Sequence, residues 1–255
     1  MLPLGLSAQR TYSLSIGSGT SYYSGDLTGS FDTRLLRAGA MVGGTAYLMP
    51  GVSLRVAVAH ATLSAADSLS DDLGRQIRNL HFRNRLYEGS GVIIWEPWPD
   101  KRFGRRYLKK PYLGPYLLMG VGLYYHSPEA QYQGTWHALQ PLGTEGQYLA
   151  DSKVAPYSRI QVSLPLGAGI GLRFAPRWGI RLEMTYRYTF TDYLDDVSTE
   201  YPDIELLRAQ SEIAATLSDR SGGLAAGARR GSPTAKDAYA TFSVQLEYFL
   251  SAFAK

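Results

Sequence analysis

Every second residue is apolar along RIQVSLPLGAGIGLRF (Arg159–Phe174), and the same period returns in WGIRLEMTYRYTF (Trp178–Phe190) after a short turn. Side chains of a strand point to opposite faces in turn, so each segment predicts a strand with one apolar and one polar or glycine face. Both segments exceed the usual strand length of about 5–6 residues. A strand that crosses an outer membrane needs about 9–11 residues. The pair therefore indicates a transmembrane hairpin with its apolar face toward lipid.

The composition agrees with one sheet-rich domain. The chain has 255 residues, 19 of them Tyr and 27 Gly, with 45% hydrophobic residues. It contains no run of about 18 apolar residues, so no transmembrane helix is predicted. A soluble β-sandwich is compatible with the same composition, but its strands are usually shorter. Cysteine is absent, which excludes disulfides and thiolate chemistry. The net charge of +4 is mild, and no basic stripe with interleaved aromatics indicates nucleic acid as a partner.

Eight segments of the chain alternate in this way and predict eight strands. They are Thr11–Tyr22, Ala38–Leu48, Val52–Thr62, Leu80–Trp95, Tyr112–Tyr125, Arg159–Phe174, Trp178–Phe190 and Ala240–Leu250. Bacterial barrels have an even number of strands, short periplasmic turns and long extracellular loops. We therefore predict an all-β fold, an eight-stranded antiparallel transmembrane β-barrel of the outer-membrane type.

The lengths of the connections fit that fold if both termini are periplasmic. Met49–Gly51 and Ala175–Arg177 are short, whereas Ser24–Arg34, Ala65–Arg78, Pro128–Tyr157 and Asp192–Lys236 are long, the last with a short helix over Leu206–Leu217. One connection, Glu96–Lys110, is longer than a usual periplasmic turn and is basic. The first nine residues, MLPLGLSAQ, resemble the end of a secretory signal peptide and its cleavage site. Residues 10–255 are then expected to form a single outer-membrane barrel domain.

Charged residues recur on the face expected to line the barrel. Eight strands enclose an interior that side chains just fill, and unpaired charges there are costly. We therefore expect a plugged lumen with a paired charge network, formed by Arg55, Glu88, Arg159, Arg173, Arg181, Glu183, Arg187 and Glu247. The alternative is a small channel or uptake protein, with a continuous water path along an Arg-lined lumen.

No catalytic or metal-binding arrangement stands out, so we expect a protein that is no enzyme and needs no cofactor or metal. The histidines have no metal-ligand spacing. An enzyme on a barrel would need His126, Asp192 or Asp195 and a hydroxyl to converge at the outer rim. The acidic run TDYLDDVSTEYPD (Thr191–Asp203) indicates a solvated loop, although hard cations also prefer such oxygen clusters. Gly167, Gly169 and Gly171 lie within a strand, where they indicate curvature or close packing and no nucleotide site.

Several phrases of the sequence resemble a known family. They are SYYSGDL (Ser21–Leu27), SDDLGRQIRNLHFRNRLYE (Ser70–Glu88), PYLLMGVGLYYHSP (Pro115–Pro128), QPLGTEGQ (Gln140–Gln147) and RYTFTDYLDDVSTEY (Arg187–Tyr201). In this order they resemble the DUF6089 family of outer-membrane β-barrels, which includes the PorG component of the type IX secretion system. The resemblance covers nearly the whole chain.

The resemblance implies a structural or scaffolding barrel in the Gram-negative outer membrane. A PorG-like role would be that of a non-enzymatic anchor whose periplasmic side contacts ring proteins of the secretion and gliding machinery. The candidate contact is the basic connection with Arg102, Arg105, Arg106, Lys109 and Lys110. A headgroup-binding or solubilising charge cluster is the other interpretation of this segment. A soluble lipocalin-like barrel would instead require the charged faces of the strands to point outward.

Overall fold

The computed structural model describes residues 11–29, 31–99, 111–152, 154–223 and 226–250. The signal-like segment 1–9 and the basic residues Arg102, Arg105, Arg106, Lys109 and Lys110 lie outside the described residues. None of the helices in the described ranges combines the length and apolar character needed to cross a membrane.

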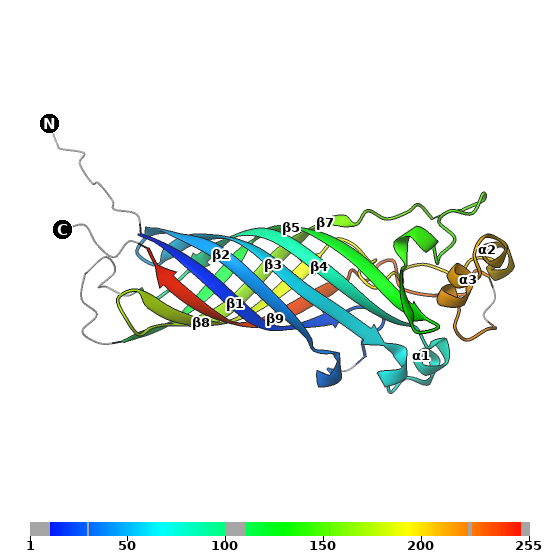
Figure 1. Cartoon of the computed structure of the whole chain (residues 1–255), viewed down its shortest axis with the longest axis horizontal. Helices are drawn as coiled ribbons and strands as arrows, with labels where there is room; N and C mark the ends of the chain where they lie inside the picture. Colours follow the sequence, from blue (N-terminus) through cyan, green and yellow to red (C-terminus); the bar gives the residue numbers. More distant parts are fainter. Residues whose placement is uncertain (1–10, 30, 100–110, 153, 224–225, 251–255) are drawn as a thin grey trace.

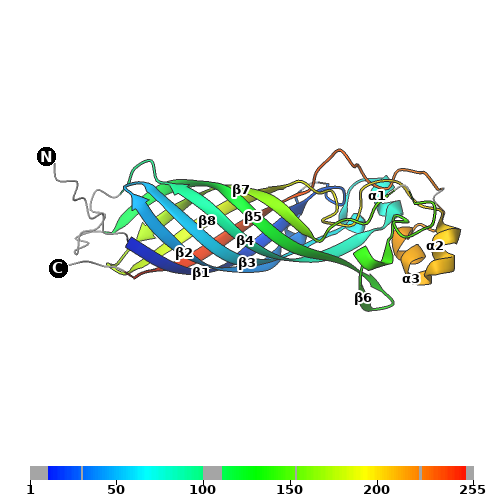
Figure 2. The same ribbon diagram turned by 90° about the horizontal axis from the view of Figure 1, so that it is seen from above.

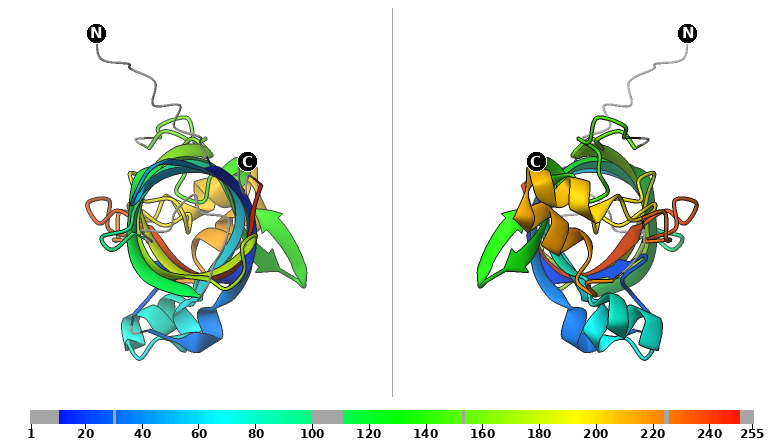
Figure 3. Two further views of the ribbon diagram at one scale, coloured as in Figure 1. Left: turned by 90° about the vertical axis from the view of Figure 1, so that its left-hand side faces the viewer. Right: turned by 90° about the vertical axis from the view of Figure 1, so that its right-hand side faces the viewer.

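Eight long strands form a closed antiparallel barrel, as predicted (Figures 1 and 3). They are β1 (Thr11–Ser24), β2 (Arg37–Met49), β3 (Val52–Ala66), β4 (His81–Trp95), β5 (Tyr112–Tyr132), β7 (Ile160–Arg173), β8 (Trp178–Thr189) and β9 (Ala238–Phe249). Each strand pairs with its neighbours in the chain, and the pairing of β1 with β9 closes the ring. Since Ser13 pairs with Phe249, the first strand starts where the last one ends.

The barrel is apolar outside and polar inside, which is the arrangement that the alternation predicts. Along β8, for example, Leu182 and Met184 are exposed, whereas Arg181, Glu183 and Thr185 are buried. The outward set from the other strands is also apolar and exposed, and includes Ile16, Val42, Val56, Val58, Ile93, Met119, Val121, Leu123, Leu166, Phe242 and Val244. This belt is the surface of a barrel that meets lipid. A lipocalin-like barrel has the opposite distribution.

Two glycines of β7 lie where neighbouring groups leave no room for a side chain. A Cβ on Gly169 would lie 2.3 Å from Cζ of Tyr116, and one on Gly167 would lie 2.5 Å from the carbonyl oxygen of Met184. Both distances are too short for a side chain to be accommodated. Close packing thus explains Gly167 and Gly169, whereas a Cβ on Gly171 would make only ordinary contacts.

The two ends of the barrel differ. One end carries the tight turns Met49–Val52 and Phe174–Trp178 and is called the short-turn end. The other end, called the cap, carries the long connections and the helices α1 (Leu73–Arg78), α2 (Ile204–Gln210) and α3 (Glu212–Ser218), as Figure 2 shows. The cap also holds three short 3-10 helices, η1 (Thr33–Leu35), η2 (Asp67–Leu69) and η3 (Gln140–Leu142).

Some of the expected loops contain regular structure. The predicted loop Ala65–Arg78 contains η2 and α1, and the helix expected over Leu206–Leu217 is two helices that meet at Ser211. Ser211 ends α2 and caps α3, because its hydroxyl accepts a hydrogen bond from the backbone N–H of Ala214.

The predicted loop Pro128–Tyr157 is wrong at its start. Strand β5 continues to Tyr132 and forms a hairpin with a ninth strand, β6 (Thr135–Ala138), which lies outside the ring. Gln133 and Gly134 make the turn with positive φ values of 47° and 82°. The polar sequence after Tyr125 hides this extension, since it lies beyond the apolar belt.

Candidate functional site: the charged lumen and its cap

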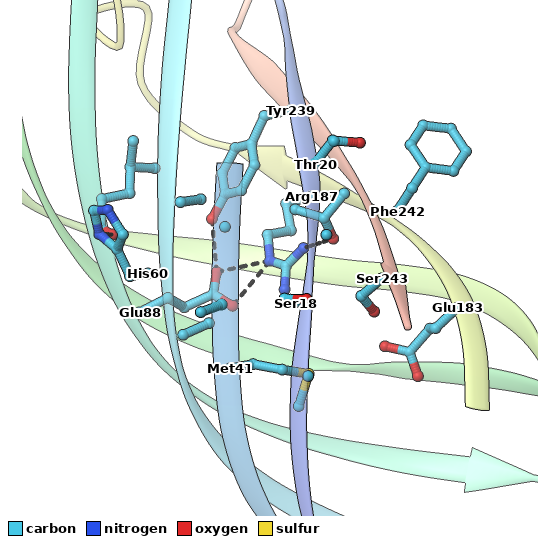
Figure 4. Close-up of a pocket in the computed structure, with 18 residues that line it drawn as sticks. Ser18, Thr20, Met41, His60, Glu88, Glu183, Arg187, Tyr239, Phe242 and Ser243 are labelled. Atoms are coloured by element: carbon cyan, nitrogen blue, oxygen red, sulfur yellow. Dashed lines mark hydrogen bonds and ion pairs between the residues drawn. The ribbon is translucent and has the colours of Figure 1, made fainter. Parts of the chain in front are cut away.

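Three layers of buried ion pairs fill the barrel. In the layer nearest the cap, the Glu88 carboxylate accepts hydrogen bonds from Arg187 Nε at 2.9 Å, Ser163 Oγ at 2.9 Å and the Tyr239 hydroxyl at 2.9 Å. Arg187 also donates from Nη1 to the hydroxyl of Thr241 at 2.7 Å. Figure 4 shows that Glu88, Arg187 and Tyr239 converge from different strands.

The middle layer is a bidentate pair between β3 and β8. Arg55 Nη1 and Nη2 each lie 2.8 Å from one oxygen of Glu183. The amide oxygen of Gln245 accepts a further hydrogen bond from Arg55, and the Tyr116 hydroxyl donates to Glu183 at 2.9 Å. Both charged side chains are buried, so the pair is held where screening by water is weak.

The layer nearest the short-turn end pairs β8 with β9. Arg181 Nε lies 3.0 Å from Glu247 Oε2, while Ser13 Oγ and the Tyr47 hydroxyl donate to Oε1 at 2.5 and 2.6 Å. The three layers together bring six of the eight predicted lumen residues into ion pairs.

The remaining two predicted lumen residues lie at the two ends of the barrel. Arg159 precedes β7, and its guanidinium lies over the ring of the outward-facing Tyr125, 5.4 Å from the centroid. Arg173 donates to the carbonyl of Pro176 at 2.6 Å and lies 4.2 Å from the Phe249 ring centroid. Arg159 thus lies outside the three layers, on the cap side of β7, whereas Arg173 lines the cavity beside Arg181 and Glu247 at the short-turn end of the lumen.

Two small cavities lie beside the charged layers. One cavity, lined by Glu88, Arg187 and Tyr239 among others, has a volume of about 40 Å³, and a second beside Arg181 and Glu247 has about 50 Å³. Such volumes hold only a few water molecules. These two cavities thus leave little free volume beside the charged pairs.

A second buried network organises the cap. One oxygen of Glu145 accepts hydrogen bonds from the backbone N–H groups of Ser198 and Thr199 and from Arg230, at 2.8, 3.0 and 3.0 Å. The other accepts from the hydroxyls of Thr199 and Tyr193. Asp196 binds the hydroxyls of Thr144 and Tyr157, and burial raises the pKa of Asp196 to about 6 despite Arg230 nearby. These contacts join segments 140–157 and 190–236 into one unit.

Arg78 joins the first two cap segments to this unit. Its guanidinium forms a bidentate pair with Asp67, at 2.7 Å from each carboxylate oxygen. The same group donates to the carbonyls of Arg230 and Asp26. All four long connections therefore contribute to a cap that is folded by polar contacts.

The Tyr23 hydroxyl lies between the carboxyl groups of Asp195 and Asp237 at the junction of barrel and cap. The Tyr23 hydroxyl oxygen lies 2.6 Å from Asp195 Oδ2 and 2.8 Å from Asp237 Oδ1. One hydroxyl hydrogen can serve only one of these contacts, so the other requires a protonated carboxyl group. The second oxygens accept from the N–H groups of Val197 and Leu194. Burial is the main cause that raises the pKa of both Asp195 and Asp237.

The proton held by this carboxyl pair predicts that the cap is weakened as the pH rises above the ordinary pKa of a carboxyl group. A carboxyl group whose pKa is higher in the folded than in the unfolded state stabilises fully in acid, and that contribution falls as the pH rises through the folded pKa. We expect the hydrogen-exchange protection of the Leu194 and Val197 amides to fall by up to about tenfold per pH unit in this range. Asp195→Asn supplies the hydrogen permanently and is expected to flatten the dependence.

The matched control for this prediction is Asp72→Asn, an exposed N-cap of α1. It is expected to leave the pH profile of the two amides as in the wild type. An Asp195→Asn profile that keeps the wild-type slope would show that the carboxyl pair does not hold the proton.

The arrangement required for a catalytic rim is not present in the described residues. His126 lies against Asn84 at 3.4 Å and the carbonyl of Ser158 at 3.3 Å, and its ring stacks on Tyr157. The carboxyl group of Asp195 is hydrogen-bonded to the Tyr23 hydroxyl. Burial raises the pKa of Asp192 to about 7. No group of three His, Asp or Glu side chains in the described ranges is placed to hold a metal ion.

The outer surface of the cap has an open cleft of about 960 Å³. Leu149, Tyr201 and Leu206 supply apolar lining, and Glu200 and Asp203 lie at the same cleft. Asp203 caps α2 by accepting from the N–H groups of Glu205 and Leu206, so this carboxylate has a structural role.

Sequence reasoning missed Tyr23, Glu145, Arg230 and Asp237. Their roles depend on contacts between segments far apart in the chain, such as the 172 residues between Tyr23 and Asp195. Two of the four do lie in phrases that carry the family resemblance, Tyr23 in SYYSGDL and Glu145 in QPLGTEGQ.

The closed ring of eight strands, the apolar outer belt and the charged interior define an eight-stranded β-barrel of the outer-membrane type. A scan of protein-family models gave no match to the chain, and neither did a search of curated proteins.

Several solved outer-membrane proteins are similar to the chain at low identity and with TM-scores below 0.5. Neisserial surface protein A is 9% identical over 93% of this chain and 96% of its own, with a TM-score of 0.47. A major outer membrane protein from Thermus thermophilus is 12% identical over 95% and 100%, with a TM-score of 0.44. Ail of Yersinia pestis, solved with the heparin analogue sucrose octasulfate, is 12% identical over 94% and 99%, with a TM-score of 0.42. These likenesses concern the fold alone.

Proposed function

We propose that the protein is a non-conducting, non-enzymatic structural barrel of the Gram-negative outer membrane. In this proposal the cap is extracellular and the short-turn end is periplasmic. The observation that supports it is the lumen, which is filled by the pairs Arg55–Glu183, Arg181–Glu247 and Arg187–Glu88. An Arg-lined channel would need guanidinium groups that face water, and these three are paired and buried or nearly so.

Conductance of the purified protein in planar bilayers tests this proposal. We expect no steady current from the wild-type protein. Its insertion is verified separately with protease added to one side of the bilayer, which is expected to leave the cap-side loops on the other side uncut. Stable unitary currents with anion selectivity would contradict the plug and favour the channel.

We further propose a PorG-like anchoring role in a type IX secretion system. The support is the resemblance of five ordered phrases to the DUF6089 family, together with the basic residues Arg102, Arg105, Arg106, Lys109 and Lys110 in one connection. In the sequence these residues come between the end of β4 at Trp95 and the start of β5 at Tyr112. A plugged barrel suits an anchor, because anchoring requires a firm hold in the membrane and no path through it.

Crosslinking in native outer membranes, followed by purification of the tagged chain and mass spectrometry, tests the anchor. Periplasmic ring proteins are expected to be recovered with the wild type and lost when the five basic residues are replaced by Gln. The control replaces Arg34 and Arg208, which are exposed in the cap, by Gln. Recovery of the barrel alone from wild-type membranes would contradict the anchoring role.

A further inference from the structure

An aromatic row marks the cap-side edge of the apolar belt on one side of the barrel. His60, Tyr87 and Tyr125 are cross-strand neighbours on β3, β4 and β5. The rings of His60 and Tyr87 lie 4.8 Å apart, and Tyr87 and Tyr125 are exposed on the outside. Tyrosines of this kind lie at the boundary between hydrocarbon and headgroups. Below the row the outward residues are apolar, such as Val58 and Leu123.

Arginines follow immediately on the cap side of this row. Arg85 and Arg83 are the next outward-facing residues of β4 from Tyr87 toward the cap. The Arg85 side chain is 49% exposed. The guanidinium of Arg83 lies 3.9 Å from the centroid of the Trp136 ring. Arg159, the residue before β7, reaches the same surface, with its guanidinium over Tyr125. These aromatic contacts hold two of the three guanidinium groups in place.

The arginines outnumber the carboxylate that pairs with them. Glu129 on β5 lies 2.7 Å from Arg83 Nε and 3.8 Å from Arg85 Nη2. The second distance is long for a charge-assisted hydrogen bond, so Arg85 keeps donors free for another oxygen ligand. The described group of three arginines and one glutamate has a net charge of +2.

We infer that Arg83, Arg85 and Arg159 form a binding surface for the phosphate group of an anionic lipid in the outer leaflet. The planar guanidinium fork matches phosphate oxygens, and a phosphate monoester carries about −1.5 to −2 charge at neutral pH, which balances the excess. The acyl chains of the lipid would lie on the apolar belt beside Tyr87 and Tyr125. This inference rests on the proposed outer-membrane location.

Native mass spectrometry of the full-length protein in detergent, titrated with phosphatidic acid or phosphatidylcholine, tests the surface. We expect the wild type to prefer phosphatidic acid, and R83Q/R85Q to bind it about tenfold more weakly or worse. R85Q alone is the second variant, since it leaves the Arg83–Glu129 pair intact, and it is expected to weaken binding by a smaller factor. The matched control R34Q/R208Q removes the same charge from exposed cap positions and is expected to bind as the wild type does.

Two results would overturn the inference. One is equal binding of phosphatidic acid by the wild type and R83Q/R85Q, and the other is displacement of the lipid by millimolar inorganic phosphate, which would indicate a site for soluble phosphate. Insertion of the wild-type chain into nanodiscs is measured separately. Failure to insert would contradict the proposed membrane location, whereas normal insertion with unselective lipid binding would contradict this surface alone.

Discussion

Glu183→Ala is expected to lower the free energy of unfolding of the barrel by about 3–5 kcal/mol. The substitution removes the bidentate partner of Arg55 and leaves a buried guanidinium without its carboxylate. It also removes the acceptor of the Tyr116 hydroxyl. The remaining acceptor of Arg55, the neutral amide oxygen of Gln245 at 3.1 Å, cannot balance the charge.

Urea unfolding of the protein in lipid vesicles, followed by tryptophan fluorescence, measures this effect. The matched control is Glu205→Ala, which breaks an exposed ion pair with Arg208 on α2 and is expected to cost less than about 1 kcal/mol. A double variant with Met in place of both Arg55 and Glu183 is expected to be much more stable than Glu183→Ala, because it leaves no unpaired charge. Equal losses for Glu183→Ala and Glu205→Ala would show that the lumen is hydrated.

Leu164→Arg is expected to impair assembly by about 2–4 kcal/mol if the side chain lies near the bilayer midplane, and by less toward its edge. Leu164 is on the outward face of β7, cross-strand from Tyr188 of β8. A charged group there would face hydrocarbon. The fraction of protein that reaches the heat-modifiable folded form in vesicles measures the effect.

The control for this substitution makes the same change outside the belt. Leu206 is exposed on α2 of the cap, so Leu206→Arg is expected to assemble as the wild type does. If both variants assembled fully, the apolar face of β7 would not be in contact with lipid.

The strands and their faces could be predicted because strand geometry alternates the side chains between two faces and the membrane requires one of those faces to be apolar. The hydrocarbon tolerates few polar side chains, so the outward positions of β7 and β8 are apolar almost without exception. The inward positions are then free to hold glycine, hydroxyl and charged residues. The same constraint correctly places the six charged residues of the three ion pairs in the lumen. Which of these residues pair with one another could not be predicted from the sequence.

The requirement for apolar outward residues ends where the strands leave the membrane. Beyond that point the sequence no longer predicts the structure. The continuation of β5 to Tyr132, the β6 hairpin and the outward turn of Arg159 all lie beyond the aromatic row. The cap depends on single carboxylates such as Glu145, whose partners come from segments about 50 to 85 residues away. Such contacts leave no local pattern.

Accessibility of spin labels along β8 tests the central claim most directly, namely that one face of the strand meets lipid and the other fills a closed lumen. The chain has no native cysteine, so each position from Trp178 to Thr189 can be replaced by a single labelled cysteine. In bilayers, labels at Leu182, Met184 and Tyr186 are expected to collide with lipid-dissolved oxygen. Labels at Gly179, Arg181 and Thr185 should reach neither oxygen nor a water-soluble nickel chelate. Strong collisions of the inner positions with the chelate would mean an open pore, and loss of the two-residue period would contradict the barrel.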